Sequence, residues 1–238
     1  ERYAARVFGA DLTYFVTNGT STANKIVFFA RVTTDDIVLV DRNCHKSAEH
    51  ALTMTHSRAV FMNPTRNRYG IIGPIPPGEM TPDAVRKKIR ACPLTRDLPE
   101  KRAVHAIITN STYDGLCYNA RRVEELLDPS VDRIHFDEAW YGYARFNPIY
   151  KDRFGMYGDP KDYPKDKPTI FTTTSTHKLL AALSQASLIS VRDGRKPVEH
   201  ARFNEAFMMH ASTSPQYAII ASNEVAAAMM DGVGGRRR

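Results

Sequence analysis

Short apolar runs alternate with segments of helical periodicity along most of the chain. Apolar runs of about 4–8 residues are typical of buried strands, whereas apolar residues spaced at helical intervals are typical of amphipathic helices. Strands are predicted at residues 12–17, 36–40, 58–62, 103–109, 133–136, 169–174 and 186–191. Helices are predicted at residues 22–31, 44–54, 119–127, 197–209 and 215–230, and a further helix of about ten residues is predicted to begin at Pro82.

This alternation predicts an α/β fold with a mostly parallel sheet and helices on both faces. We expect one domain over residues 1–232, followed by a basic tail over residues 233–238, because no linker or internal repeat is visible. Ligands of such folds bind outside the carboxyl ends of the strands. A ligand site is therefore predicted where polar residues follow the strands, which are Gly19 to Ser21, His45, Thr112 and Asp114, Asp137, and Ser175 to Lys178.

Charge and composition exclude some classes of protein. The net charge of +7 is scattered along the 238 residues. A nucleic-acid binder needs a continuous basic face with interleaved aromatic residues, so nucleic acid is not an expected partner. No apolar run approaches the ~20 residues of a membrane span, so no membrane partner is expected either.

The cysteines indicate the compartment. They are Cys44, Cys92 and Cys117, and no two of them form a C-x-x-C pair. An odd number at wide spacing argues against a disulfide framework and against a structural zinc site. A reducing environment fits this pattern, so we expect a cytoplasmic location and predict no metal.

The segment from Asn18 to Thr22 has the residues of an anion-binding turn. It places a glycine and several hydroxyl side chains at the start of a predicted helix. Free backbone amides and the positive end of the helix dipole suit a phosphate group. The segment matches neither G-x-x-x-x-G-K-[ST] nor G-x-G-x-x-G, so ATP and dinucleotides are not expected. The alternative is a capped helix that holds no ligand.

Lys178 follows a predicted strand and stands beside hydroxyls and an imidazole. A lysine amine can bond covalently to the carbonyl carbon of a substrate or of pyridoxal phosphate. Asp137 also closes a predicted strand, where a carboxylate can pair with the cationic ring nitrogen of that cofactor. His45 can stack on a flat ring or relay a proton. The alternatives are a surface lysine, an aspartate that caps a helix or binds a metal, and a histidine that begins a helix.

Other readings of these residues are weaker or concern packing. A Ser-His-Asp hydrolase is disfavoured because the chain contains no G-x-S-x-G elbow. Trp140, Tyr141 and Tyr143 are expected in the core or at a subunit interface, with one of them in a substrate pocket. The pairs Met208-Met209 and Met229-Met230 are predicted to lie in the core.

The longest motifs resemble one family. Over nearly all of residues 1–232 the chain is similar to the bacterial Orn/Lys/Arg decarboxylases, and within them to the acid-inducible arginine decarboxylase branch. The resemblance implies a pyridoxal 5'-phosphate enzyme with an aspartate-aminotransferase-like (fold type I) large domain of three layers. The segments that carry it are 18–25, 41–47, 64–74, 109–116, 135–143, 175–180, 184–187 and 203–210.

The resemblance also implies roles for individual residues. Lys178 would hold the cofactor covalently, Asp137 would pair with its pyridine nitrogen, and His45 would stack over its ring. His177 would lie beside the bond to Lys178, near the substrate carboxylate. The phosphate would be bound by Thr20, Ser21 and Ser175, with Ser212 or Thr213 reaching the phosphate of a neighbouring subunit, while Trp140 and Glu138 are expected to contact substrate.

The function implied by the resemblance is decarboxylation of a basic amino acid, first of all L-arginine to agmatine and CO2. Lysine or ornithine is the alternative substrate, and an inactive, truncated cofactor-binding module is the alternative to an enzyme. A different pyridoxal reaction, such as transamination or aldol cleavage, also stays open because fold does not determine reaction. Family members are several times longer and pair as homodimers that build larger rings, so a homodimer or higher homo-oligomer is expected.

Overall fold

The computed structural model describes residues 1–98 and 100–237. These residues form one seven-stranded sheet with the strand order β1-β7-β6-β5-β4-β2-β3. β7 is antiparallel to β1 and β6, and every other neighbouring pair is parallel, as predicted. The strands are β1 (Leu12–Val16), β2 (Ile37–Asp41), β3 (Arg58–Met62), β4 (Ala103–Thr109), β5 (Arg133–Asp137), β6 (Thr169–Thr174) and β7 (Ser187–Arg192).

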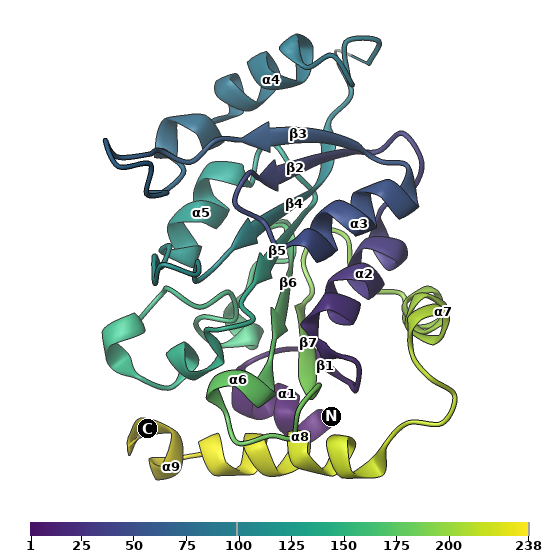
Figure 1. The fold of residues 1–238 in the computed structure, drawn as a ribbon, viewed down its shortest axis with the longest axis vertical. Coiled ribbons are helices and arrows are strands. Elements are labelled where there is room, and N and C mark those ends of the chain that lie inside the picture. The colour runs from purple at the N-terminus through teal and green to yellow at the C-terminus, as the bar shows by residue number, and fades with distance from the viewer. Residues whose placement is uncertain (99, 238) are drawn as a thin grey trace.

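Helices cover both faces of this sheet and complete a three-layer α/β fold (Figure 1). One face packs against α2, α3 and α7, and the other against α1, α4, α5 and α8. The helices are α1 (Arg2–Phe8), α2 (Gly19–Arg31), α3 (Lys46–Thr55), α4 (Pro82–Ala91), α5 (Ala120–Leu127), α6 (Thr176–Leu179), α7 (His200–His210), α8 (Tyr217–Met230) and α9 (Val233–Arg237). Short 3₁₀ helices lie in the loops at Pro77–Met80, Gly142–Arg145, Pro148–Tyr150 and Pro160–Asp162.

The predicted elements agree with the structure where the sequence contains a clear apolar run or a helix-start motif. β3, β4 and β6 have the predicted bounds, and α4 begins at Pro82 with the Thr81 side chain accepting a hydrogen bond from the Ala84 amide at 3.4 Å. α1 was not predicted. It has only seven residues, too few for a clear helical pattern in the sequence. Its apolar side is identified in the structure by the packing of Phe8 and its neighbours into the core.

The methionine prediction was wrong for most of its residues. Met208 and Met209 are 46% and 70% exposed, Met229 is also exposed, and only Met230 is buried. Apolar residues occupy both the buried and the exposed side of α8, but only the buried side packs against the rest of the described chain. Composition alone therefore does not distinguish the buried side of this helix from the exposed side.

His105 on β4 gives the domain a predictable response to acid. Its ring is fully buried beside Phe28, and neither ring nitrogen has a hydrogen-bond partner in the described part of the chain. Burial, and then the neighbouring His135, lower the pKa of His105 well below its usual value. The unfolded chain binds a proton below about pH 6.5 and the folded chain does not, so stability falls as the pH falls.

His105→Leu is therefore expected to stabilise the protein more at pH 5 than at pH 8. The difference should be about 2 kcal/mol, at ~1.4 kcal/mol per pH unit below the ordinary histidine pKa. Urea denaturation of both proteins at the two pH values measures it. His50→Leu, on the exposed side of α3, is the control and should show no such pH dependence. An equal gain at both pH values for His105→Leu would contradict the prediction.

Candidate active site

A cavity of about 710 Å³ opens where the parallel strands end. Lys178 and Asp137 both line it, although they come from different segments, one after β6 and one at the end of β5. The other predicted site residues that line the same cavity are Thr20, Ser21, His45, Trp140, Ser175 and His177. The fold thus brings most of the predicted site together at the edge where it was expected.

The start of α2 forms one end of the cavity. Gly19 has a φ of +78°, a left-handed conformation that favours glycine, and the side chain of Asn18 does not cap the helix. The first turn, all of which the structure describes, contains no acidic residue. The Thr20 and Ser175 hydroxyl oxygens lie 2.6 Å apart. Uncapped amides, hydroxyls and the helix dipole together suit a bound anion.

Asp137 presents a carboxylate to the interior of the cavity. It is almost fully buried, and it accepts hydrogen bonds from Asn24 Nδ2 at 2.8 Å and from the Ala139 amide at 3.3 Å. Burial raises the pKa of Asp137, while the bond from Asn24 and the nearby His45 and Lys178 oppose that rise. A cation placed against this carboxylate would be held by a largely desolvated negative charge.

Lys178 lies in the short helix α6, half-buried in the cavity wall. Its Nζ lies 4.4 Å from the centroid of the Trp140 ring. Burial lowers the pKa of Lys178, and the charge of Asp137 opposes the change. The lowered pKa increases the neutral fraction of the amine, which is the nucleophilic form.

His45 lies at the start of α3 and also lines the cavity. The helix-start role and the position beside a ligand, which were given as alternatives, are therefore compatible. His45 is the N-cap of α3, and its Nδ1 accepts a hydrogen bond from the Ser47 amide at 3.2 Å. His177 is also oriented by the backbone, because its Nδ1 lies 2.8 Å from the Ala186 carbonyl oxygen. A carbonyl only accepts, so Nδ1 of His177 donates and Nε2 is left to act as an acceptor.

Three predicted residues are not brought to this cavity. Ser212 and Thr213 are exposed in the loop between α7 and α8 and line a separate cavity of about 780 Å³. Glu138 follows Asp137 directly, so its side chain points to the opposite side of the chain. Its Oε1 accepts from Asn110 Nδ2 at 2.7 Å and from the Gly155 amide at 2.9 Å.

The environment of Glu138 favours the neutral form of its carboxyl group. Burial raises the pKa of Glu138 well above its usual value, and the bonds from Gly155 and Asn110 only partly oppose this. A raised folded pKa means that the group favours folding at low pH, and that this contribution is lost as the pH rises.

Glu138→Gln is therefore expected to stabilise the protein increasingly above about pH 4.5, by roughly 1.4 kcal/mol per pH unit until the folded pKa is reached. Glutamine keeps the shape of the side chain and its acceptor oxygen. It does not titrate, so the free energy that folding spends on protonating Glu138 above its unfolded pKa is removed. Denaturation curves at several pH values test this, with Glu205→Gln on the exposed side of α7 as the control. A gain that does not grow with pH would refute it.

Several cavity residues were not predicted from the sequence. Asn24 lies one helical turn after Thr20 on α2, and this i, i+4 spacing was the available signal. After β4 the cavity is lined by Ser111 and Tyr113, in place of the expected Thr112 and Asp114, because alternate residues of this loop face it. The remaining unpredicted lining residues include Asn43, Lys46, Thr109 and Gln185.

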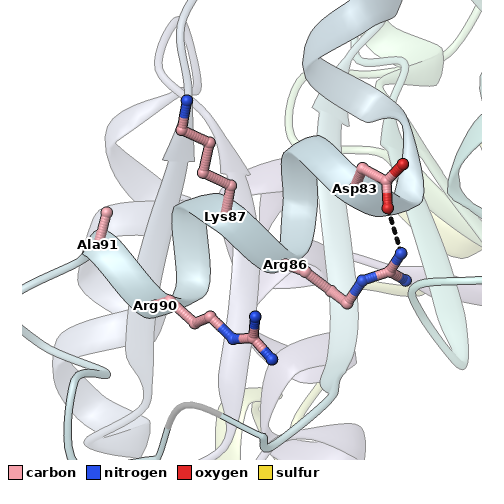
Figure 2. A pocket seen from close by; sticks show the side chains of 5 residues that line it. All are labelled: Asp83, Arg86, Lys87, Arg90 and Ala91. Atoms are coloured by element: carbon pink, nitrogen blue, oxygen red, sulfur yellow. Dashed lines mark hydrogen bonds and ion pairs between the residues drawn. The ribbon is translucent and has the colours of Figure 1, made fainter.

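A group of basic side chains lies outside this cavity, on the exposed surface of α4. Figure 2 shows Arg86 paired with Asp83, and Lys87 pointing away from Arg86 and Arg90. These side chains line a cavity of about 440 Å³. All of these side chains come from one exposed helix, and none of the predicted site residues is among them. It is a solvated face of the helix, in keeping with scattered positive charge.

No helix in the described residues is long and apolar enough to cross a membrane.

Comparison with known proteins gives the family. The family model described as the Orn/Lys/Arg decarboxylase major domain matches residues 1–238. The biodegradative arginine decarboxylase of Escherichia coli is 57% identical over 235 residues, which are 99% of this chain and 31% of that protein. The structure of lysine decarboxylase A from Pseudomonas aeruginosa superposes with a TM-score of 0.94 at 54% identity, covering 100% of this chain and 31% of that one.

The fold extends beyond these relatives. A serine palmitoyltransferase from S. paucimobilis, solved with a bound adduct of pyridoxal phosphate, has a TM-score of 0.65 at 11% identity, covering 98% of this chain and 52% of that one. At such low identity the likeness shows the fold alone, which is fold type I. The present chain spans about a third of the length of the decarboxylases it matches. From the full-length family match and the close structural similarity, we conclude that the chain belongs to the Orn/Lys/Arg decarboxylase family.

Proposed function

We propose that this chain is the cofactor-binding part of a pyridoxal-phosphate enzyme that decarboxylates a basic amino acid, with L-arginine as the first candidate. The observation that carries the proposal is the shared cavity of Lys178 and Asp137, with the uncapped start of α2 at its end. Residues 1–232 would form the domain that holds the cofactor. The similarity to the arginine decarboxylase favours arginine, giving agmatine and CO2.

The residues present suit pyridoxal phosphate in charge and chemistry. Lys178 would bond to its aldehyde carbon, Asp137 would face its ring nitrogen, and His45 would contact its ring. The phosphate would be held by Thr20, Ser21, Ser175 and the amides of α2, because these supply donors and no competing carboxylate. When bound, the cofactor supplies an electron sink for the bond that breaks between Cα and the carboxylate.

The side chains of the cavity would contribute binding and proton transfer. The lowered pKa of Lys178 makes its amine a competent nucleophile and then a proton carrier at Cα. The Asp137 carboxylate would hold a proton on the facing ring nitrogen by charge attraction. The ring of His177, held by the bond from Nδ1 to the Ala186 carbonyl oxygen, would lie near the substrate carboxylate. The Trp140 ring would exclude water from the amine of Lys178.

Product analysis of the full-length protein tests this proposal. Incubation with arginine, lysine and ornithine should release CO2 and the matching amine from one of them, and the protein should carry a visible cofactor band. The lysine alternative has direct support from the similarity to lysine decarboxylase A. A coloured protein that decarboxylates none of the three would favour an inactive cofactor-binding module, and a keto acid product would favour transamination.

We further propose that the full-length protein acts in the cytoplasm as a homodimer or a larger homo-oligomer. The separate cavity beside Ser212 and Thr213 supports the assembly of several copies, because the exposed Met208 lines it and apolar surface of this kind is typical of interfaces. Either hydroxyl could then reach the phosphate site of a neighbouring subunit. Size-exclusion chromatography with light scattering measures the oligomeric state, and a monomer would contradict it.

A further inference from the structure

A continuous set of hydrogen bonds runs along the wall of the cavity, through Asn24. The Asn24 side chain is 1% exposed. Its Nδ2 lies 2.8 Å from Asp137 Oδ2 and 2.9 Å from Ser47 Oγ, and its Oδ1 lies 2.6 Å from Thr173 Oγ1. Ser47 Oγ in turn lies 2.9 Å from His45 Nδ1. One amide therefore touches the carboxylate of Asp137 and connects to the ring of His45.

The carboxylate determines the orientation of the amide. An ionised carboxylate only accepts hydrogen bonds, so the NH2 group of Asn24 must face Asp137. The reversed amide would place two acceptor oxygens against each other. The second hydrogen of this NH2 group points to Ser47 Oγ, and the amide oxygen accepts the hydroxyl proton of Thr173. Both hydrogens of the NH2 group and the amide oxygen of Asn24 thereby have partners.

The same reasoning assigns the proton on His45. Ser47 Oγ accepts from Asn24, so its own proton is free to be donated to His45 Nδ1. Nδ1 also accepts the Ser47 amide hydrogen, as the N-cap geometry requires. Two donors converge on Nδ1, so the neutral ring carries its proton on Nε2.

The far end of the set is closed by His135. Its Nε2 lies 3.0 Å from Thr173 Oγ1. The Thr173 proton is already committed to Asn24, so His135 donates and Thr173 accepts. Burial lowers the pKa of His135 to about 3, which keeps this ring neutral and adds no charge beside Asp137. The whole set therefore donates in one direction, toward Asp137 and His45.

We propose that Asn24 is a positioning residue that aims the Asp137 carboxylate and, through Ser47, the His45 ring at the same ligand. The inference rests on the proposed function, since the ligand is the pyridoxal ring. It extends that function by assigning to one buried amide on α2 the joint placement of the two groups that would face the ring. Asn24 would act through these groups and would not itself touch the reacting atoms.

The test compares two buried asparagines in the full-length protein. Asn24 donates to Asp137 at 2.8 Å, and Asn110 donates to Glu138 at 2.7 Å, so each alanine variant removes a buried bond to a carboxyl group. In Asn24→Ala the dissociation constant for pyridoxal phosphate, measured by fluorescence titration of the apo-protein, should rise about 10- to 100-fold, because a hydrogen bond to a charged group is lost. The pH midpoint of the bound cofactor's absorbance change should also shift, by about one unit. Asn110→Ala should leave both quantities unchanged within error.

Two further variants keep the inference testable if Asn24→Ala does not fold. Thr173→Val keeps the shape of the side chain and removes the donor to the Asn24 oxygen. It should shift the pH midpoint of the cofactor absorbance in the same direction as Asn24→Ala, but by a smaller amount. Ser47→Ala removes the hydroxyl that links Asn24 to His45 and keeps the bond from Asn24 to Asp137, so it should lower kcat and leave the midpoint in place.

Each outcome has a distinct meaning. Unchanged cofactor affinity and midpoint in Asn24→Ala, or equal changes in Asn110→Ala, would overturn the role of Asn24 and leave the proposed function intact. A wild-type midpoint in Thr173→Val together with a shifted one in Ser47→Ala would overturn it as well. A wild-type protein that binds no pyridoxal phosphate would overturn both the inference and the proposed function.

Discussion

Replacing Lys178 with alanine in the full-length protein is expected to abolish decarboxylation and to stop borohydride from fixing pyridoxal phosphate to the chain. Lys178 is the half-buried amine of the cavity, with a lowered pKa and Asp137 nearby. The variant loses the covalent nucleophile and the proton carrier at once, so turnover should fall by about 10⁴-fold or more. Amine release and mass spectrometry after borohydride treatment measure the two effects.

Lys46 provides the control for this experiment, because it lines the same cavity from the start of α3 and is exposed. Lys46→Ala should still be labelled, and the modified peptide should contain residue 178. If Lys178→Ala were still fixed to cofactor by borohydride, another amine would hold the cofactor and the assignment of Lys178 would be refuted.

Asp137→Asn is expected to lower kcat by about 10²–10³-fold, a typical loss for one preorganised electrostatic group. Asparagine keeps the size of the side chain and removes the negative charge that would hold a proton on the facing ring nitrogen. Some cofactor should stay bound, because Lys178 and the hydroxyls at the start of α2 are unchanged. Steady-state kinetics and cofactor absorbance measure the two quantities separately.

The neighbouring carboxyl group supplies the comparison. Glu138→Gln removes an equally buried acid that faces Asn110 and Gly155, away from the cavity, so its kcat should stay close to that of the wild type. Near-normal kcat in Asp137→Asn, or an equal loss in both variants, would show that charge at position 137 is not what the reaction needs.

Much of the fold follows from local patterns in the chain. β3, β4 and β6 are predictable to the residue because short apolar runs bounded by polar residues leave few alternatives. The rule that ligands bind at the carboxyl ends of parallel strands then places Asp137 and Lys178 at one edge. Their meeting in one cavity follows from strand order, which hydrogen bonding of β5 to β6 establishes.

Other features depend on contacts between distant segments. Asn24 is 113 residues from Asp137 and 149 residues from Thr173, so no local pattern predicts that these side chains share hydrogen bonds. The exposure of Met208 and Met209 depends on which side of a helix finds a partner. The separation of Ser212 and Thr213 from the cavity depends on the path of the loop after α7.

The sequence by itself determined the strands and most of the longer helices, the edge of the sheet where chemistry is expected, and the residue types suited to a phosphate and a cationic ring. These depend on periodicity and on side-chain chemistry, which each segment carries alone. Only the tertiary structure decided that Asp137 faces the cavity while Glu138 is buried behind it, and that Asn24 links Asp137 to His45. Desolvation and hydrogen bonding are properties of the packed surroundings, and those surroundings exist only once distant parts of the chain are brought together.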